Sequence, residues 1–253
     1  MTTDNLQRIY LDGRHYDLAY SAFTEDIDFW IGAARRYGGP VLELACGTGR
    51  IAVPLAREGF DVTGVDLAES MLEQAARNSE REGLGVGWAK ADMRDFSLGR
   101  TYPLIICPSQ SISRLLTNED LERCLSSIKE HLGAGGVFIM ELYNPSLEIL
   151  SRGEERAPFL EYDHPDGGGR VRVDVSSAYD KATQLQSLTL HYSLPGVARQ
   201  PTEHVRIRMY FPQELEAMLK YNGFEVRAKY GDFNGKPFES GDNHQILVCG
   251  VSE

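Results

Sequence analysis

The chain has 253 residues and a formal net charge of -11 at pH 7, and 25% of its residues are charged. This length allows one domain with a full core, and an acidic chain without a clustered basic face argues against nucleic acid as a partner. No stretch is apolar for long enough to span a membrane, and residues 1–5 lack the features of a secretion signal. We therefore expect a cytoplasmic protein without a membrane partner.

The first 147 residues are predicted to alternate between helices and strands. The first predicted helix follows Thr24, a capping residue, and carries an apolar face made of Ile27, Trp30, Ile31 and Ala34. Beyond it we expect a strand from residue 41, a helix at 51–58 ended by Gly59, a strand at 61–66, a helix at 70–81 ended by Gly83, strands at 86–91 and 104–107, a helix capped by Thr117 and ended by Gly133, and a strand at 136–143. This alternation predicts a parallel sheet covered on both faces, with its ligand site at the carboxyl ends of the strands.

The pattern changes after residue 143. Three segments around Val173, Leu190 and Val205 alternate apolar with polar residues, and turn-rich stretches separate them. Period two of this kind predicts an antiparallel meander with one apolar face. A helix at 213–221 and strands at 225–230 and 245–251 follow, so the meander is an insertion. The last two strands have no crossover helix between them, which favours a hairpin at the sheet edge.

Residues 41–50, V-L-E-L-A-C-G-T-G-R, are the most informative segment of the chain. An apolar strand that enters a glycine turn lets the backbone approach a ligand closely, because glycine has no Cβ and accepts a positive φ. The next strand ends on Asp66, where a carboxylate can accept both hydroxyls of a ribose. The pattern therefore predicts a cofactor that contains a nucleoside.

The glycine turn alone does not decide which cofactor binds. Gly47-x-Gly49-x-x-Ala52 formally satisfies the dinucleotide fingerprint, which would favour NAD. However, Glu43 lies within a buried strand, where a carboxylate needs a partner such as a cationic amino group. The segment Ala91-Asp92-Met93 offers a carboxylate and an apolar side chain at a place where an adenine could lie. These features favour an adenosine joined to an amino acid.

Together these motifs resemble those of class I S-adenosylmethionine (SAM)-dependent methyltransferases of the small-molecule type. The resemblance covers roughly residues 15–147 and 211–251 and implies an α/β fold: a Rossmann-like doubly wound sheet with a terminal antiparallel hairpin, plus an inserted antiparallel β-meander. It divides the chain into an N-terminal lid and helix (1–39), a SAM-binding domain (40–147 and 211–253) and an inserted subdomain that covers the substrate (148–210). The implied cofactor-binding residues are Tyr16, Glu43, Ala45, Cys46, Gly47, Thr48, Gly49, Asp66, Leu67, Met71, Ala91, Asp92, Met93, Pro108 and Ser109.

The substrate side is less constrained. The predicted substrate residues are Tyr20, Gln110, Ser111, Tyr143, Asn144, His191 and Arg206. His244 is the first candidate for a catalytic base because an antiparallel last strand would begin at the pocket edge, although an amine can also lose its proton to solvent. The acceptor is expected to be a small polar metabolite or a natural-product intermediate that receives the methyl group on N, O or C.

Some questions stay open at the level of sequence. No spacing of His, Cys, Asp or Glu is typical of a metal site, so we expect no metal, and four cysteines without a CxxC pair predict buried reduced thiols. A SAM-binding protein without methyl transfer and an NAD-dependent oxidoreductase are the alternatives, although the second would normally carry a Tyr-x-x-x-Lys pair. A homodimer also stays open.

Overall fold

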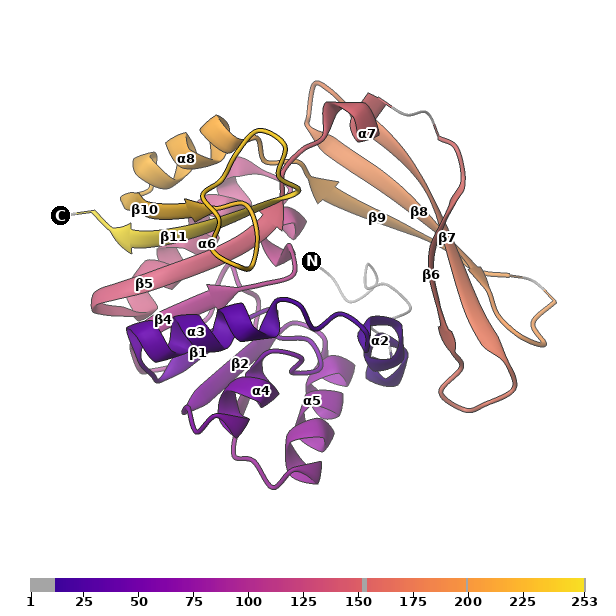
Figure 1. The fold of residues 1–253 in the computed structure, drawn as a ribbon, viewed down its shortest axis with the longest axis horizontal. Helices are drawn as coiled ribbons and strands as arrows, with labels where there is room; N and C mark the ends of the chain where they lie inside the picture. The colour runs from indigo at the N-terminus through magenta and orange to yellow at the C-terminus, as the bar shows by residue number, and fades with distance from the viewer. Residues whose placement is uncertain (1–11, 152–153, 199, 253) are drawn as a thin grey trace.

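The computed structural model describes residues 12–151, 154–198 and 200–252, so the first eleven residues of the predicted lid segment lie outside the described part. Two sheets dominate the molecule: a seven-stranded sheet in one half and a four-stranded sheet in the other (Figure 1). The short helix α2 (Gly13–Tyr20) lies at the side where the two halves approach each other. A ligand held between the sheets would therefore contact both.

The seven-stranded sheet has the predicted Rossmann-like arrangement. Its order is β10-β11-β5-β4-β1-β2-β3; β1 to β5 pair in parallel, and β11 pairs antiparallel with both β5 and β10. The strands are β1 (Val41–Leu44), β2 (Val62–Asp66), β3 (Gly87–Lys90), β4 (Tyr102–Cys107), β5 (Leu132–Tyr143), β10 (Phe224–Tyr230) and β11 (His244–Val251). The reversed β11 places its first residue beside the last residue of β5, as the predicted hairpin requires.

Helices cover both faces of this sheet. The helices are α3 (Ile27–Tyr37), α4 (Ala52–Arg57), α5 (Glu69–Arg81), α6 (Asn118–His131) and α8 (Pro212–Tyr221). Trp30 of α3 and Leu55 of α4 pack with Val41 in one core, whereas Leu125 of α6 and Leu215 of α8 belong to the other. Because neighbouring residues of a strand point to opposite faces, the apolar run of β1 serves both cores.

Two predicted helix boundaries are wrong. Helix α3 begins after Asp26, and Thr24 contributes only its backbone carbonyl, which accepts from the N–H of Ile27. Helix α6 is capped by Thr117 as predicted, since the Thr117 side chain accepts from the Asp120 N–H at 3.0 Å, but the helix ends at His131 rather than at Gly133. Strand β5 starts at the next residue and includes Gly133, because its pairing with β4 begins as early as Leu132.

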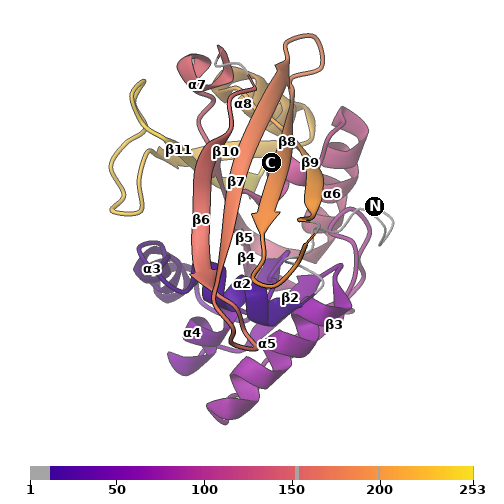
Figure 2. The same cartoon turned by 90° about the vertical axis from the view of Figure 1, so that its right-hand side faces the viewer.

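The four-stranded sheet is an antiparallel meander in the order β6-β7-β8-β9, as the period-two segments predicted. Its strands are β6 (Ala157–Asp163), β7 (Arg170–Asp180), β8 (Leu185–Ser193) and β9 (Thr202–Arg208). Figure 2 shows this sheet standing in front of the carboxyl-end edge of the larger sheet. The sequence analysis missed β6, whose alternation is broken by a register shift between Pro158 and Leu160, and also the short helices α2 and α7 (Leu147–Ser151).

The described residues bear on three further predictions from composition and spacing. All four cysteines are buried and unpaired, as predicted. No helix in the described part of the chain has both the length and the apolar character needed to cross a bilayer. Within the same residues, no group of three or more His, Cys, Asp or Glu side chains could hold a metal ion.

Candidate active site

A cavity of about 880 Å³ lies between the carboxyl ends of the parallel strands and the inner face of the four-stranded sheet. This volume falls within the range of small-molecule and cofactor sites. Nineteen of the residues predicted from sequence line it: Tyr16, Tyr20, Glu43, Ala45, Cys46, Gly47, Asp66, Leu67, Met71, Ala91, Asp92, Met93, Pro108, Ser109, Gln110, Ser111, Tyr143, Asn144 and His244. The fold therefore collects into one space residues that lie up to 228 positions apart in the sequence.

The glycine turn and the acid after β2 are fixed to each other. The N–H of Gly47 donates to Asp66 Oδ2 at 2.8 Å, and the N–H of Ala68 donates to Asp66 Oδ1 at 2.8 Å. Gly47 has a φ of 57°, and a Cβ there would lie 3.3 Å from Met71 Cε, so a side chain would crowd this wall of the cavity. A carboxylate has about four acceptor positions, which leaves Asp66 capacity for ribose hydroxyls.

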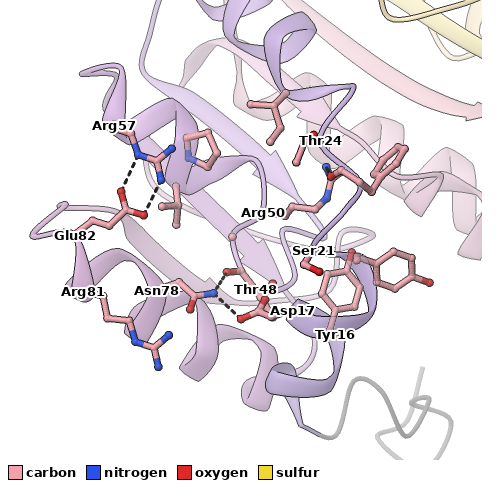
Figure 3. A pocket seen from close by; sticks show the side chains of 16 residues that line it. Tyr16, Asp17, Ser21, Thr24, Thr48, Arg50, Arg57, Asn78, Arg81 and Glu82 are labelled. Carbon is pink, nitrogen blue, oxygen red and sulfur yellow. Dashed lines mark hydrogen bonds and ion pairs between the residues drawn. The ribbon is translucent and has the colours of Figure 1, made fainter. Parts of the chain in front are cut away.

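Thr48 and Gly49, which were predicted to bind the cofactor, point away from the cavity. They line a smaller pocket of about 330 Å³ behind the turn (Figure 3). A Cβ on Gly49 would lie 2.8 Å from Trp88 Cη2, and its φ is 80°, so packing and backbone conformation explain this glycine without a ligand. A sequence motif cannot distinguish these two reasons for glycine.

The smaller pocket shows how helix α2 is attached to the rest of the molecule. Asn78 of α5 donates to Asp17 Oδ2 at 3.0 Å and to the carbonyl of Thr48 at 3.1 Å, as Figure 3 shows, and Gln74 donates to the same Asp17 oxygen at 3.0 Å. These contacts position the rings of Tyr16 and Tyr20, whose centroids are 4.7 Å apart and which line the main cavity. One carboxylate thus anchors the segment that bears both predicted tyrosines.

Glu43 has an unsatisfied carboxylate oxygen. The side chain is 2% exposed and lines the cavity, and Oε2 has no hydrogen-bond partner among the described residues. Burial raises the pKa of Glu43 to about 8, although the nearby Arg50 guanidinium and the Ala52 N–H favour the charged form. An orphaned acceptor in this position fits a cationic amino group, which the amino-acid end of SAM would supply.

Asp92 differs from the simple adenine acceptor that the sequence predicted. Arg94 binds it through Nε at 3.0 Å and through Nη2 at 2.6 Å, and also reaches Asp120 at 2.6 Å. Burial by itself would raise the pKa of Asp92, but the hydrogen bonds from Arg94 outweigh it and the net shift is downward. Asp92 still lines the cavity beside Met93, so a ligand there meets an ion-paired carboxylate.

His244 lies against a buried carboxylate that the sequence analysis did not identify. Its Nδ1 is 2.8 Å from Oε1 of Glu141, which is 3% exposed, and the hydrogen bond to this carboxylate raises the pKa of His244. The other Glu141 oxygen accepts from the N–H of Gln110 at 3.1 Å. The available signal was a charged residue inside the apolar run V-F-I-M-E-L of β5.

The loop after β4 is held in an uncommon backbone conformation. Ser109 and Gln110 have φ values of 55° and 59°, which non-glycine residues rarely adopt outside functional sites. Glu141 holds the Gln110 N–H, and Arg50 donates to Ser109 Oγ at 2.8 Å. Arg50 is itself paired through both terminal nitrogens with the buried Asp26, at 2.6 and 2.7 Å. Arg50 and Asp26 were not identified from the sequence.

His191 and Arg206, two of the predicted substrate residues, lie on the wrong face of the four-stranded sheet. Their neighbours in the strands line the cavity, whereas they do not, because successive side chains of a strand alternate between its faces. His191 instead contacts Ser176 at 3.1 Å, and Arg206 is exposed to solvent. Asn144 does line the cavity, but its amide nitrogen donates to the carbonyl of Asp242 at 2.9 Å.

Comparison with known proteins agrees with this geometry. The family model described as "Methyltransferase domain" matches residues 41–136. The chain is 29% identical over 221 residues to the dTDP-3-amino-3,4,6-trideoxy-alpha-D-glucopyranose N,N-dimethyltransferase of Streptomyces venezuelae, covering 86% of this chain and 88% of the relative. It is 33% identical over 199 residues to the dTDP-4-amino-2,3,4,6-tetradeoxy-D-glucose N,N-dimethyltransferase of Saccharopolyspora spinosa, covering 78% and 75%.

A solved structure shows the same fold. The CcbJ methyltransferase from Streptomyces caelestis superposes with a TM-score of 0.79 at 24% identity, over 92% of this chain and 95% of that one. Together with the orphaned Glu43 oxygen and the paired Gly47 and Asp66, the relative at 33% identity completes the identification. The chain belongs to the class I SAM-dependent methyltransferases and is an enzyme that uses SAM to methylate a small molecule.

Proposed function

We propose that this enzyme transfers the methyl group of SAM to an amino nitrogen of a small molecule held between the two sheets. One observation carries the proposal: His244, backed by Glu141, shares a single cavity with the glycine turn and Asp66. Both of the relatives named above are N,N-dimethyltransferases, which supports nitrogen over oxygen or carbon. His244 at the cavity wall could take a proton from the substrate ammonium, because an amine must be neutral to attack the methyl group of SAM.

The cofactor-side residues have separate roles in this proposal. Glu43 would accept a hydrogen bond from the amino group of SAM, and Asp66 would accept hydrogen bonds from the ribose hydroxyls. Gly47, which has no side chain, leaves room for the ligand at the cavity wall. Met93 and Ala91 pack against the adenine, while the pairing of Asp92 with Arg94 fixes the loop that carries them. Bound SAM supplies a methyl group that is already activated, so the main tasks of the protein are alignment and exclusion of water, and proximity can contribute about 7 to 11 kcal/mol in favourable systems.

His244 acts on the proton in this proposal. We assign the Nδ1–H to the hydrogen bond with Glu141, a tautomer that leaves Nε2 as the acceptor for a proton of the substrate ammonium. Glu141 then stabilises the imidazolium that forms, since its carboxylate is 2.8 Å from the ring nitrogen. The left-handed Ser109-Gln110 loop, held by the same carboxylate, borders the acceptor.

The division of the chain follows the same scheme. Residues 40–147 and 211–253 bind SAM, residues 1–39 contribute the lid and first helix, and residues 148–210 cover the acceptor. Tyr16 closes over the methionine end and Tyr20 over the acceptor, with Gln110, Ser111, Tyr143 and Asn144 on the opposite wall. We further propose that the enzyme is cytoplasmic and acts without nucleic acid. Both a monomer and a homodimer are compatible with this scheme.

A transfer assay with paired acceptors tests the reaction. Labelled SAM is incubated with the enzyme and with small amines, each matched to the alcohol in which hydroxyl replaces the amino group. We expect label in N-methyl products of the amines and none in the alcohols. Label only in O-methyl or C-methyl products, with SAM binding intact by calorimetry, would contradict the assignment of the acceptor atom.

A further inference from the structure

The roof of the cavity is an apolar surface supplied by the four-stranded sheet. We define the roof as the aliphatic residues on the inner face of β7, β8 and β9, which are Val173, Val175, Leu188, Leu190, Val205 and Ile207. Every one of them has a hydrocarbon side chain, and Val175, Leu188 and Ile207 remain half-exposed to the cavity. An acceptor that reaches the roof must present apolar surface, because a polar one would lose its hydration there without replacement.

Gln186 is a polar interruption of this surface. It occupies the inner face at the start of β8, two residues before Leu188, and pairs in register with Ile207. The residue is 8% exposed, and it lines the cavity. A ligand that excludes water from this part of the cavity must replace the hydrogen bonds of the Gln186 amide, because a polar group that is buried without a partner is costly.

The charges on the cavity wall disfavour an anionic acceptor. Arg50 and Arg94 line the cavity, but Asp26 pairs with the first and Asp92 and Asp120 with the second. Arg114, the remaining arginine of the lining, also has interactions of its own. The lining further includes the acidic residues Glu25, Glu43, Asp66, Asp92 and Glu141. A nucleoside diphosphate would face carboxylates here, and Arg50 and Arg94 are already paired with carboxylates of the protein.

We propose, on the basis of the amine methylation proposed above, that the acceptor is an amine carried on an apolar body without phosphate. A hydroxyl or carbonyl group of that body pairs with Gln186, and the body packs against the roof. The acceptor class thus differs from the nucleoside-diphosphate sugars in the names of the two curated relatives. Specificity resides in the inserted sheet, while the chemistry resides at the edge of the larger sheet.

Binding in the presence of S-adenosylhomocysteine tests the acceptor class without turnover. The first probe is 2-(1-naphthyl)ethylamine, and the second is its analogue with a hydroxyl on the ethyl chain. We expect the hydroxylated amine to bind at least tenfold more tightly by calorimetry, and thymidine diphosphate in tenfold excess to leave both affinities unchanged. Displacement of the amines by thymidine diphosphate, or equal affinity of the two amines, would overturn the proposal.

Three variants locate the binding surface. Leu188→Arg should weaken both amines at least tenfold because it inserts a charge into the roof. Ser187→Arg is the matched control, since Ser187 is the neighbouring residue on the exposed face and pairs with Arg206. Gln186→Leu, which keeps the apolar surface intact, should abolish the preference for the hydroxylated amine. An unchanged preference in a folded Gln186→Leu variant contradicts the role of this side chain.

A turnover arm separates this proposal from the reaction itself. One amino sugar is offered both as a naphthyl glycoside and as its thymidine-diphosphate derivative, with labelled SAM. We expect N-methylation of the glycoside alone. Methylation of only the diphosphate form would overturn the acceptor class but leave amine methylation standing. O-methylation without N-methylation would contradict the proposed function, while the binding measurements would still decide the acceptor class.

Discussion

The two walls of the cavity are built on different principles. The edge of the seven-stranded sheet is dense in hydrogen-bonded charge: Asp66 is held by two backbone N–H groups, Arg94 by two carboxylates, and His244 by Glu141. The inner face of the four-stranded sheet is hydrocarbon except for Gln186 and the hydroxyl end of Tyr192, which donates to Glu203. Directional contacts therefore specify one wall, whereas shape and apolar surface specify the other.

The sharpest test of the charged wall is His244→Ala. If His244 accepts the proton, kcat should fall by at least about a hundredfold, since general acid–base groups typically contribute 10² to 10⁴. The dissociation constant of S-adenosylhomocysteine should stay within about twofold of wild type, because the cofactor contacts lie elsewhere. A steady-state assay with calorimetry checks both values. An unchanged kcat would mean that the acceptor loses its proton to solvent.

The next largest effect is expected from Asp66→Ala. The substitution removes an acceptor that holds the Gly47 turn and that we propose to bind the ribose, and charge-assisted hydrogen bonds contribute about 1.5 to 3 kcal/mol. Cofactor affinity should therefore fall at least about tenfold. Calorimetric titration with S-adenosylhomocysteine measures the change, and circular dichroism establishes that the variant is folded. Wild-type affinity would remove Asp66 from the site.

The pairing of His244 with Glu141 predicts a directional shift in pH dependence. Glu141 raises the pKa of His244 by stabilising the imidazolium, so activity should rise as pH increases through that pKa and the base becomes neutral. Glu141→Gln removes the charge, lowers the pKa of His244 and should move the acidic limb of the kcat profile to lower pH. A profile that stays in place would show that the limb belongs to another group.

Glu43 links cofactor binding to a proton. Because burial raises the pKa of Glu43 to about 8, the side chain is mostly protonated at pH 7, and a cationic amino group beside it favours the carboxylate. Binding of S-adenosylhomocysteine at pH 7 should release a fraction of one proton, and the release should disappear well above pH 8. Calorimetry in buffers of different ionisation enthalpy measures it. Glu43→Gln should abolish the release, and its persistence would assign the proton elsewhere.

The smallest effect is expected on the outer face of the four-stranded sheet. His191→Ala and Arg206→Ala change residues on the face opposite the roof, so kcat and KM should both stay within about twofold of wild type. Steady-state kinetics of each variant suffices. A large rise in KM for either would break the distinction between the two faces.

Much of the charged wall could be predicted from the sequence because its requirements are local. A positive φ together with the nearby Met71 side chain favours glycine at position 47, and the proposed ribose site needs a carboxylate at the end of β2. Each requirement leaves a residue type at a fixed spacing. Glu43 was identifiable because a carboxylate inside a buried strand contradicts the pattern around it. Glu141 and Gln186 are likewise polar residues at apolar positions of their strands. They were not predicted because neither belongs to a recognisable motif.

The alternation of strands and helices and the reversed terminal hairpin could be predicted from the sequence, because periodicity and turn chemistry act between residues close in the chain. The cofactor was predicted from the resemblance of the motifs to those of one family. Only the tertiary structure decided which partner each charge has: Arg50 with Asp26, Arg94 with Asp92, and Glu141 with His244, which lies 103 positions away. It also decided which face of the meander meets the ligand. The alternation of apolar and polar residues shows that a strand has two different faces. Which face is buried depends on how one sheet packs against the other.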